Sequence, residues 1–236
     1  MVKAAKDTEI PPRERIVRAL MHLAAETPFE RITITQICEE AKVTLATFRE
    51  LFPSKGAVLG AYARGIDLQV LKLNASDLDD EPTKDRLFDV LMRRLDAMAD
   101  DKSALEAISR WARREPLSAL ALNQVMLNSM RFMLETAGID SEGPLGALKL
   151  QGLVLAWTQV LEVWFKDDRP GLDATMAALD KALERGGRLV GQAESMGKLF
   201  APLELMGRTL HNLRRDSSSR MRERWNPPKS DEPAGV

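Results

Sequence analysis

Residues that could do metal or nucleophilic chemistry are few and scattered in this chain. The two histidines, His22 and His211, have no partner at ligand spacing. The single cysteine, Cys38, falls on the inward side of a predicted helix, where a buried structural thiol is expected rather than a nucleophile. The sequence also contains no Gly-rich phosphate loop and no nucleophile elbow. We therefore expect no enzyme, no bound metal and no cofactor.

A second set of residues suits contact with a polyanion. Thr33 and Thr44 are residue types that cap helices, and each stands where a short helix is predicted to begin. Arg49 lies in the second of these helices, and its planar guanidinium can hold a phosphate or the edge of a guanine. Two short helices with a tight turn at Lys42 and Val43 have the geometry that places a recognition helix in the major groove of DNA.

The elements that position these residues are predicted to be helices throughout, because apolar residues recur with a period near 3.6 and alternation is scarce. The first helix is expected over 12–27, the second after Thr33 and the third from Thr44. Their expected inward residues are Ile16, Val17, Leu20, Leu23, Ala24, Ile34, Ile37, Ala41, Phe48, Leu51 and Phe52. Further helices are expected at about 54–71, 84–99, 102–114, 117–137, 145–166 and 172–186, with a loop at 74–83.

Charge is unevenly distributed along the 236 residues, although the formal net charge is only −1. Residues 1–65 hold 10 Lys/Arg against 8 Asp/Glu, residues 66–184 hold 14 against 21, and residues 185–236 hold 10 against 6. A basic end can face DNA or an anionic bilayer, whereas an acidic middle would repel both. Chance variation in composition explains the small excess of positive charge in residues 1–65 equally well.

One cysteine excludes an internal disulfide, and no uncharged stretch approaches the length of a transmembrane helix. The charged start of the chain, with Pro11 and Pro12, lacks the apolar run of a signal peptide. The expected location is therefore the cytoplasm.

The segment from Ile32 to Leu59 resembles the head signature of the tetracycline-repressor (TetR) family. The matching positions follow one another without a gap: Ile34, Ile37, Ala41, Val43, Thr44, Thr47, Phe52, Pro53, Ser54, Lys55 and Leu59. The resemblance implies an all-α, TetR-like fold, in which a three-helix helix-turn-helix head precedes a helical ligand and dimerisation body. It also implies a bacterial, homodimeric transcriptional regulator, a repressor, that binds double-stranded DNA and is released by a small apolar effector.

The resemblance also assigns roles within the head. Thr44, Leu45, Ala46 and Thr47 would face the groove, Thr33 and Thr35 would meet phosphate at a helix N-terminus, and Lys55 would add a phosphate contact from the other flank. Helix capping alone is the alternative role for the threonines. The chain departs from the family where Leu45 replaces a frequent polar residue and Arg49 replaces a phosphate-contacting tyrosine. Leu45 can offer only an apolar contact, such as one to a thymine methyl group.

The body resembles the family in its last helices, between Leu145 and Arg185. This implies a dimer interface formed by Leu161, Trp164, Met176, Leu179 and Leu183. It places an effector between body helices, where the candidate lining residues are Met92, Leu95, Met98, Trp111, Met126, Met130, Met133 and Trp157. A plain core role is the alternative for each. The predicted domains are a flexible N-terminus (1–11), a helix-turn-helix domain (12–56), a ligand-binding and dimerisation domain (57–187), an amphipathic helix (188–215) and a disordered tail (216–236).

The rear of the chain also resembles the ubiquinone-biosynthesis lipid-binding proteins, which share the TetR fold. Those relatives lie on membranes through a terminal amphipathic helix, and residues 189–214 carry an apolar stripe beside Lys198, Arg208 and Arg214. The alternative function is therefore a lipid-binding protein that contacts membranes peripherally through 189–214. Docking of this helix against its own body or a partner subunit is the competing interpretation.

Liposome flotation of the intact protein and of a chain ending at Gly187 tests the membrane hypothesis. If 189–214 is a membrane helix, flotation requires the tail and anionic lipid, because each cation near such a surface adds roughly 1 kcal/mol. No flotation with either lipid, together with a lower melting temperature on truncation, would instead identify a structural helix.

Overall fold

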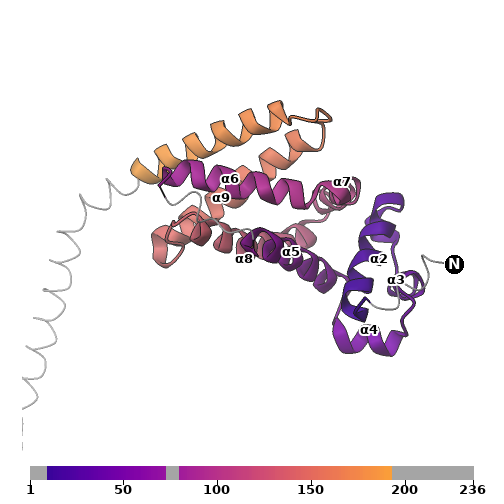
Figure 1. The fold of residues 1–236 in the computed structure, drawn as a ribbon. Coiled ribbons are helices and arrows are strands. Elements are labelled where there is room, and N and C mark those ends of the chain that lie inside the picture. The colour runs from indigo at the N-terminus through magenta and orange to yellow at the C-terminus, as the bar shows by residue number, and fades with distance from the viewer. Residues whose placement is uncertain (1–9, 73–79, 193–236) are drawn as a thin grey trace, which may run out of the picture. The chain divides into compact units, whose positions relative to one another are not determined.

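The computed structural model describes residues 10–72 and 80–192, and within these ranges every regular element is helical (Figure 1). The all-α prediction is thus confirmed. Several predicted segments lie wholly or partly outside the described residues: positions 1–9 of the expected N-terminus (1–11), most of the expected loop, the amphipathic segment beyond residue 192 and the expected tail at 216–236. One compact unit extends to Arg188. Among the described helices, none is long and apolar enough to cross a membrane.

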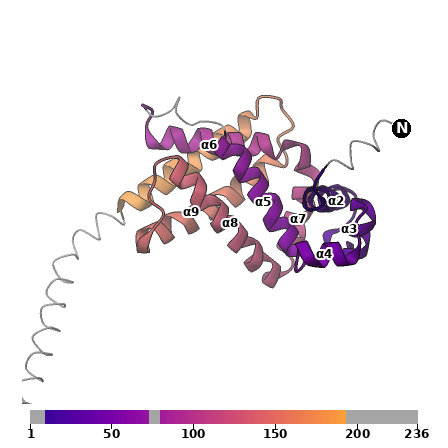
Figure 2. The same ribbon diagram turned by 60° about the horizontal axis from the view of Figure 1, so that its bottom comes forward.

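The head contains the three helices expected from the sequence and one short 3-10 helix that was not expected. They are α2 (Pro12–Glu26), the short 3-10 helix η1 (Phe29–Arg31), α3 (Ile34–Ala41) and α4 (Leu45–Leu51). Figures 1 and 2 show α2, α3 and α4 grouped at one end of α5. Ile16, Leu20, Ile37, Phe48 and Phe52 are buried in the head core. Ile34 was expected to be buried but is 37% exposed, because it opens α3 on the outer side of the helix.

The body follows the expected order of helices. They are α5 (Lys55–Lys72), α6 (Thr83–Ala97), η3 (Ala99–Asp101), α7 (Lys102–Ala112), α8 (Pro116–Thr136), α9 (Gly143–Trp164) and a helix at 173–192. The last helix was expected to end at Gly186 but continues to 192. Its start is fixed by Asp167, whose carboxylate accepts hydrogen bonds from the Thr175 amide and hydroxyl, each at 2.9 Å. These bonds hold the pKa of Asp167 below its ordinary value.

Helix α7 belongs to the head as much as to the body. Its residues Ala104 and Ile108 are buried in the head core, and the ring of Trp111 packs against that of Phe29 with centroids 4.5 Å apart. The other side of α7 faces the remaining body helices. Apolar packing therefore joins the head to the body. The free energy of this packing is roughly proportional to the apolar area removed from water.

The body core contains a buried ion pair. Arg94 of α6, 1% exposed, donates to the Asp67 carboxylate of α5, and the Ser129 hydroxyl of α8 donates to the same oxygen at 2.6 Å. The pair ties three helices together. Removing one partner alone would leave a buried charge uncompensated, a cost of about 3–5 kcal/mol in comparable cases.

Three of the residues predicted for a dimer interface instead lie in the protomer's own core. Trp164, Leu179 and Leu183 are buried among residues of α6, α8 and α9. Leu161 and Met176 are half-buried. Burial within the protomer leaves Trp164, Leu179 and Leu183 little surface for a partner, and the interface itself stays a prediction.

Candidate nucleic-acid interface and body cavity

Helix α3 begins with a capping box. The Thr33 hydroxyl accepts a hydrogen bond from the Gln36 amide at 3.2 Å, and the Gln36 side chain accepts one from the Thr33 amide at 2.8 Å. The capping role expected for Thr33 is thus confirmed. Thr35 is exposed in the first turn. The amides of this turn that have no partner within the helix point outward at its positive end, where an anion is favoured.

The turn between α3 and α4 is held from two sides. Lys42 adopts a left-handed conformation with φ of 53°, which ends α3 and redirects the chain. The Val43 amide donates to the Cys38 carbonyl at 3.0 Å, and Arg15 of α2 donates to the Lys42 carbonyl at 3.3 Å. The angle between α3 and α4 is therefore fixed by backbone geometry and by the first helix.

Helix α4 has an inner apolar face and an outer face open to solvent. Phe48 and Phe52 are buried, with ring centroids 6.0 Å apart. The Thr44 hydroxyl caps the helix by accepting from the Thr47 amide at 3.1 Å, and the Thr44 and Thr47 hydroxyls lie 2.9 Å apart. On the outer face Leu45 is 56% exposed, and Ala46 and Arg49 are also exposed. This face can offer one apolar contact and one guanidinium to a base edge or phosphate.

Several cations of the head are used internally. Arg13 donates to the Leu51 carbonyl at 3.3 Å and stacks 4.6 Å above the Phe52 ring, so it holds the C-terminus of α4. Lys55 donates to the carbonyls of Phe29 and Ile32 at 2.6 and 2.9 Å, and its ammonium lies 4.3 Å from the Phe29 ring centroid. Burial lowers the pKa of Lys55. Lys55 was predicted to contact phosphate, but its ammonium is already hydrogen-bonded to the carbonyls of Phe29 and Ile32.

The thiol and imidazole of the head have no arrangement for catalysis. Cys38 is buried as expected, and burial raises the pKa of its thiol, which disfavours the nucleophilic thiolate. His22 is exposed on α2, with its Nδ1 3.1 Å from the Glu40 carboxylate. Cys38 thus packs in the head core, and the His22 ring faces the Glu40 carboxylate at the surface.

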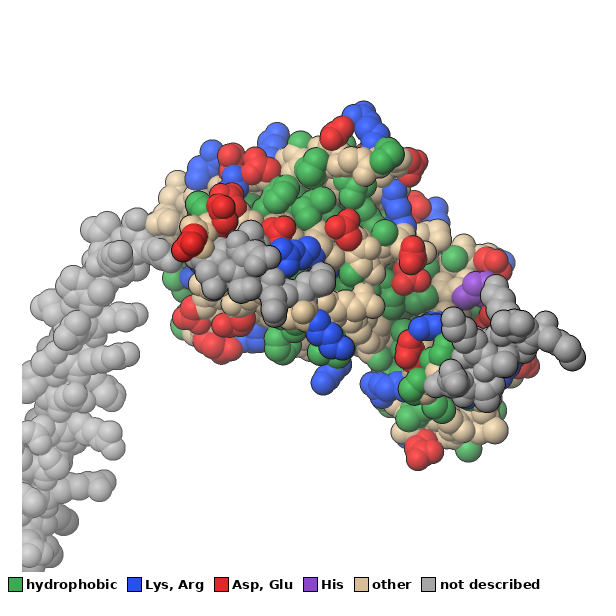
Figure 3. All heavy atoms as spheres, viewed as in Figure 1, with side chains coloured by type: hydrophobic (Ala, Val, Ile, Leu, Met, Phe, Trp, Pro, Cys, Tyr) green, Lys and Arg blue, Asp and Glu red, His purple; other side chains and the backbone are tan. Residues whose placement is uncertain are grey.

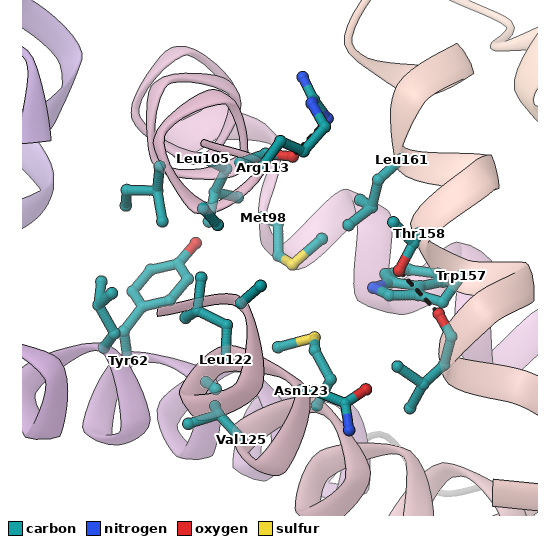
Figure 4. A pocket seen from close by; sticks show the side chains of 18 of the residues that line it. Tyr62, Met98, Leu105, Arg113, Leu122, Asn123, Val125, Trp157, Thr158 and Leu161 are labelled. Carbon is teal, nitrogen blue, oxygen red and sulfur yellow. Dashed lines mark hydrogen bonds between the residues drawn. The ribbon is translucent and has the colours of Figure 1, made fainter. Parts of the chain in front are cut away.

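The body contains a cavity of about 270 Å³ between helices α5 to α9. In Figure 4, Tyr62 approaches from one side, Trp157 and Thr158 lie on the other, and Met98 lies between them. Of the predicted lining residues, Met98, Met126 and Trp157 face this cavity. Leu95, Met130 and Met133 are fully buried in the core instead, Met92 packs against that core, and Trp111 contacts Phe29.

Sequence reasoning missed the polar residues of the cavity, among them Tyr62 and Arg94. Apolar type was the criterion for lining residues, so neither was considered. A signal was present for Arg94, because it stands four positions after Val90 and four before Met98 on the apolar face of α6. A cation on the buried face of a helix requires a buried partner, which here is Asp67.

The face shown in Figure 3 has no large patch of only positive or only negative side chains. Lys/Arg and Asp/Glu side chains are interspersed there over both head and body. The charge excess of the first part of the sequence therefore does not mark a binding face in this view. The exposed residues of α3 and α4 indicate a binding face more specifically than the distribution of charge does.

Lys55 can be tested by Lys55→Met. We expect the free energy of unfolding in urea to fall by roughly 1–2 kcal/mol, because two hydrogen bonds from a charged donor are lost. Lys72→Met, which removes an exposed lysine from the same helix, should change it little. If Lys55 mainly contacted phosphate, stability would instead be unchanged and the salt slope of DNA binding would fall by about 1.

Comparison with known proteins supports the architecture. No protein-family profile and no curated protein matches the chain. Among solved structures, a TetR transcriptional regulator from Nitrosomonas europaea is similar with a TM-score of 0.59 and 20% identity, over 75% of this chain and 99% of that one. A TetR transcriptional regulator from Rhodococcus sp. RHA1 is similar with a TM-score of 0.54 and 19% identity, over 74% and 95%. The chain has the all-α fold of TetR transcriptional regulators.

Proposed function

We propose that the protein is a DNA-binding transcriptional regulator, a repressor, that places α4 in the major groove. The observation that carries this proposal is the outer face of the α3–α4 pair. Its backbone is fixed by two threonine caps and a left-handed turn, and its solvent side holds Leu45, Ala46 and Arg49. A rigid helix with unpaired exposed side chains is what direct readout of base edges needs.

Helices α3 and α4 are suited to different contacts with DNA. The N-terminus of α3, with Thr33 and Thr35, is suited to a phosphate, because first-turn amides and the helix dipole favour an anion. Arg49 supplies a charged contact to guanine or phosphate, and Leu45 packs against a thymine methyl group. Phosphate contacts then set the register, whereas the α4 residues select the sequence.

Helix α7 supports control of the head by a small apolar effector. Leu105, Ser109 and Arg113 line the body cavity, while Ala104 and Trp111 pack toward the head. An effector that enlarges the cavity would act on α7, the helix on which the head also packs. The effector would have to bind one position of α7 more tightly than another. The change in affinity for DNA could not exceed that difference in effector affinity.

The protein acts as a homodimer through the outer face of α8 and α9. Leu148 and Leu155 are 53% and 58% exposed on α9, seven positions apart and so on one side of the helix, and Phe132 is half exposed on α8. Asn123 and Gln151 join the two helices by reciprocal hydrogen bonds of 3.5 and 3.3 Å. Exposed apolar side chains at this spacing favour pairing with a second copy.

Selection of genomic fragments with the purified protein, followed by Arg49→Ala, tests the DNA proposal. Binding to the enriched site should weaken by roughly 1–3 kcal/mol, as for loss of a base or phosphate contact. Arg169→Ala removes the same charge from an exposed turn of the body and should leave affinity within a few tenths of a kcal/mol. If no fragment is enriched even at low salt, the proposal is wrong.

Sedimentation of Leu155→Asp tests the dimer. The wild-type protein should be a dimer at micromolar concentration, and the variant a monomer, because an interfacial carboxylate would be desolvated without a partner. Leu68→Asp, at an exposed leucine of α5, should stay dimeric. A wild-type protein that sediments only as a monomer, or a dimer indifferent to Leu155→Asp, would overturn this arrangement.

A further inference from the structure

The polar side chains of the body cavity differ in whether they are open to a ligand. The Tyr62 hydroxyl is hydrogen-bonded to the Asp101 carboxylate, and the Arg94 guanidinium is buried against Asp67. Both groups are thus used within the protein. Arg113, which directly follows α7, is different, because its side chain lines the cavity and is about half exposed.

Arg113 lies at the edge of the cavity, and apolar side chains lie beyond it. In Figure 4 the guanidinium of Arg113 points away from the centre of the cavity, and Leu161 of α9 lies on the other side. The stem of Arg113 therefore forms part of the wall, while its charged end stays near solvent. Met98 and Trp157 are buried, and Met126 is half-buried. A bound molecule can place its apolar part against these three residues and a polar group at Arg113.

One edge of the Arg113 guanidinium, formed by Nε and Nη2, has no partner among the described residues. The other nitrogen, Nη1, donates to the Ser109 hydroxyl at 3.0 Å and to the Glu162 carboxylate at 3.4 Å. Two parallel N–H groups on one edge of a guanidinium match the two oxygens of a carboxylate. This edge therefore favours an acid group over a hydroxyl, which has one oxygen for the two donors.

The position of Arg113 at the edge also makes an anion acceptable there. A carboxylate beside it stays in contact with water and avoids most of the cost of burying a charge. The competing acceptor is Glu162 of α9, whose side chain is also about half exposed and whose contact with Nη1 is long. Exposed ion pairs of this kind contribute little to stability, so Glu162 does not prevent a ligand carboxylate from binding the guanidinium.

We propose that the cavity binds a compact amphipathic carboxylate, whose acid group accepts hydrogen bonds from Nε and Nη2 of Arg113. Its apolar part lies against Met98, Met126 and Trp157. The volume of about 270 Å³ is near the lower end of the usual range for ligand sites, which suits a short or medium alkyl chain or a small ring system. This inference rests on the effector role proposed above and adds an acid group to the apolar effector.

Titration calorimetry of the full chain with decanoate, decanol and decylamine, each below its micelle-forming concentration, tests the proposal. The three probes share an alkyl chain and differ only in the head group. Decanoate should bind roughly tenfold more tightly than either of the others, because it alone can accept two charge-assisted hydrogen bonds from Arg113. Hexanoate should bind severalfold more weakly than decanoate, since it leaves part of the apolar wall uncovered.

Variants of the edge residues separate the head group from the alkyl chain. Arg113→Gln should weaken decanoate binding about tenfold and leave decanol binding unchanged. Arg113→Lys should also weaken decanoate binding, because an ammonium keeps the charge but lacks the planar fork. Glu162→Gln should strengthen decanoate binding severalfold, because it removes the competing carboxylate.

Arg110→Gln is the matched control. Arg110 is an exposed arginine of α7 that pairs with Glu106 and does not line the cavity, so its loss should leave all three affinities unchanged. Equal binding of decanoate and decanol, tighter binding of decylamine, no binding of any probe, or a preference for decanoate that persists in Arg113→Gln would each overturn the proposal. Failure of the head to bind DNA would show instead in the fragment selection, with these ratios unaffected.

Discussion

The packing of α7 between two apolar cores is the constraint on which the rest of the structure depends. The helix has only three turns, and the head core and the cavity wall both require its side chains. Phe29 and Trp111 close the head side, and Lys55 holds Phe29 in place through the η1 carbonyls. Packed interiors do not deform continuously, so the proposed regulation requires a shift between discrete arrangements of α7 when the cavity changes.

The Asp67–Arg94–Ser129 group makes the cavity wall rigid at Arg94 of α6. Its three members come from α5, α6 and α8, and each is buried. An apolar replacement of similar volume could be equally stable, so stability alone does not require the pair. Its geometry does orient the Arg94 guanidinium, which forms part of the cavity wall. In the proposed regulation, a cavity wall that is rigid at α6 favours movement of α7 when a ligand binds.

The sequence predicted the fold well because its signals are local. Caps at Thr33 and Thr44 and the 3.6-residue period located most helices within about two residues. The side chains of the site were predicted less well, because their surroundings are set by distant helices. Lys55 meets η1, Leu179 and Leu183 meet the body core, and most predicted methionines fill that core. Periodicity identifies a buried face but not whether a core, a cavity or a partner covers it.

In the regulatory function proposed above, the free energy that a ligand can supply is limited by the size of the cavity. A molecule that fits about 270 Å³ makes few polar contacts, and one hydrogen bond to a charged donor contributes about 1.5–3 kcal/mol. If that bond forms in only one arrangement of α7, affinity for DNA changes by roughly tenfold to a hundredfold, since each 1.4 kcal/mol is a factor of about ten. An apolar ligand with no acceptor would have to obtain the same difference from shape alone. In the proposed regulation, a ligand that forms such a bond with a polar residue of the cavity wall is therefore better able to change the affinity of the head for DNA.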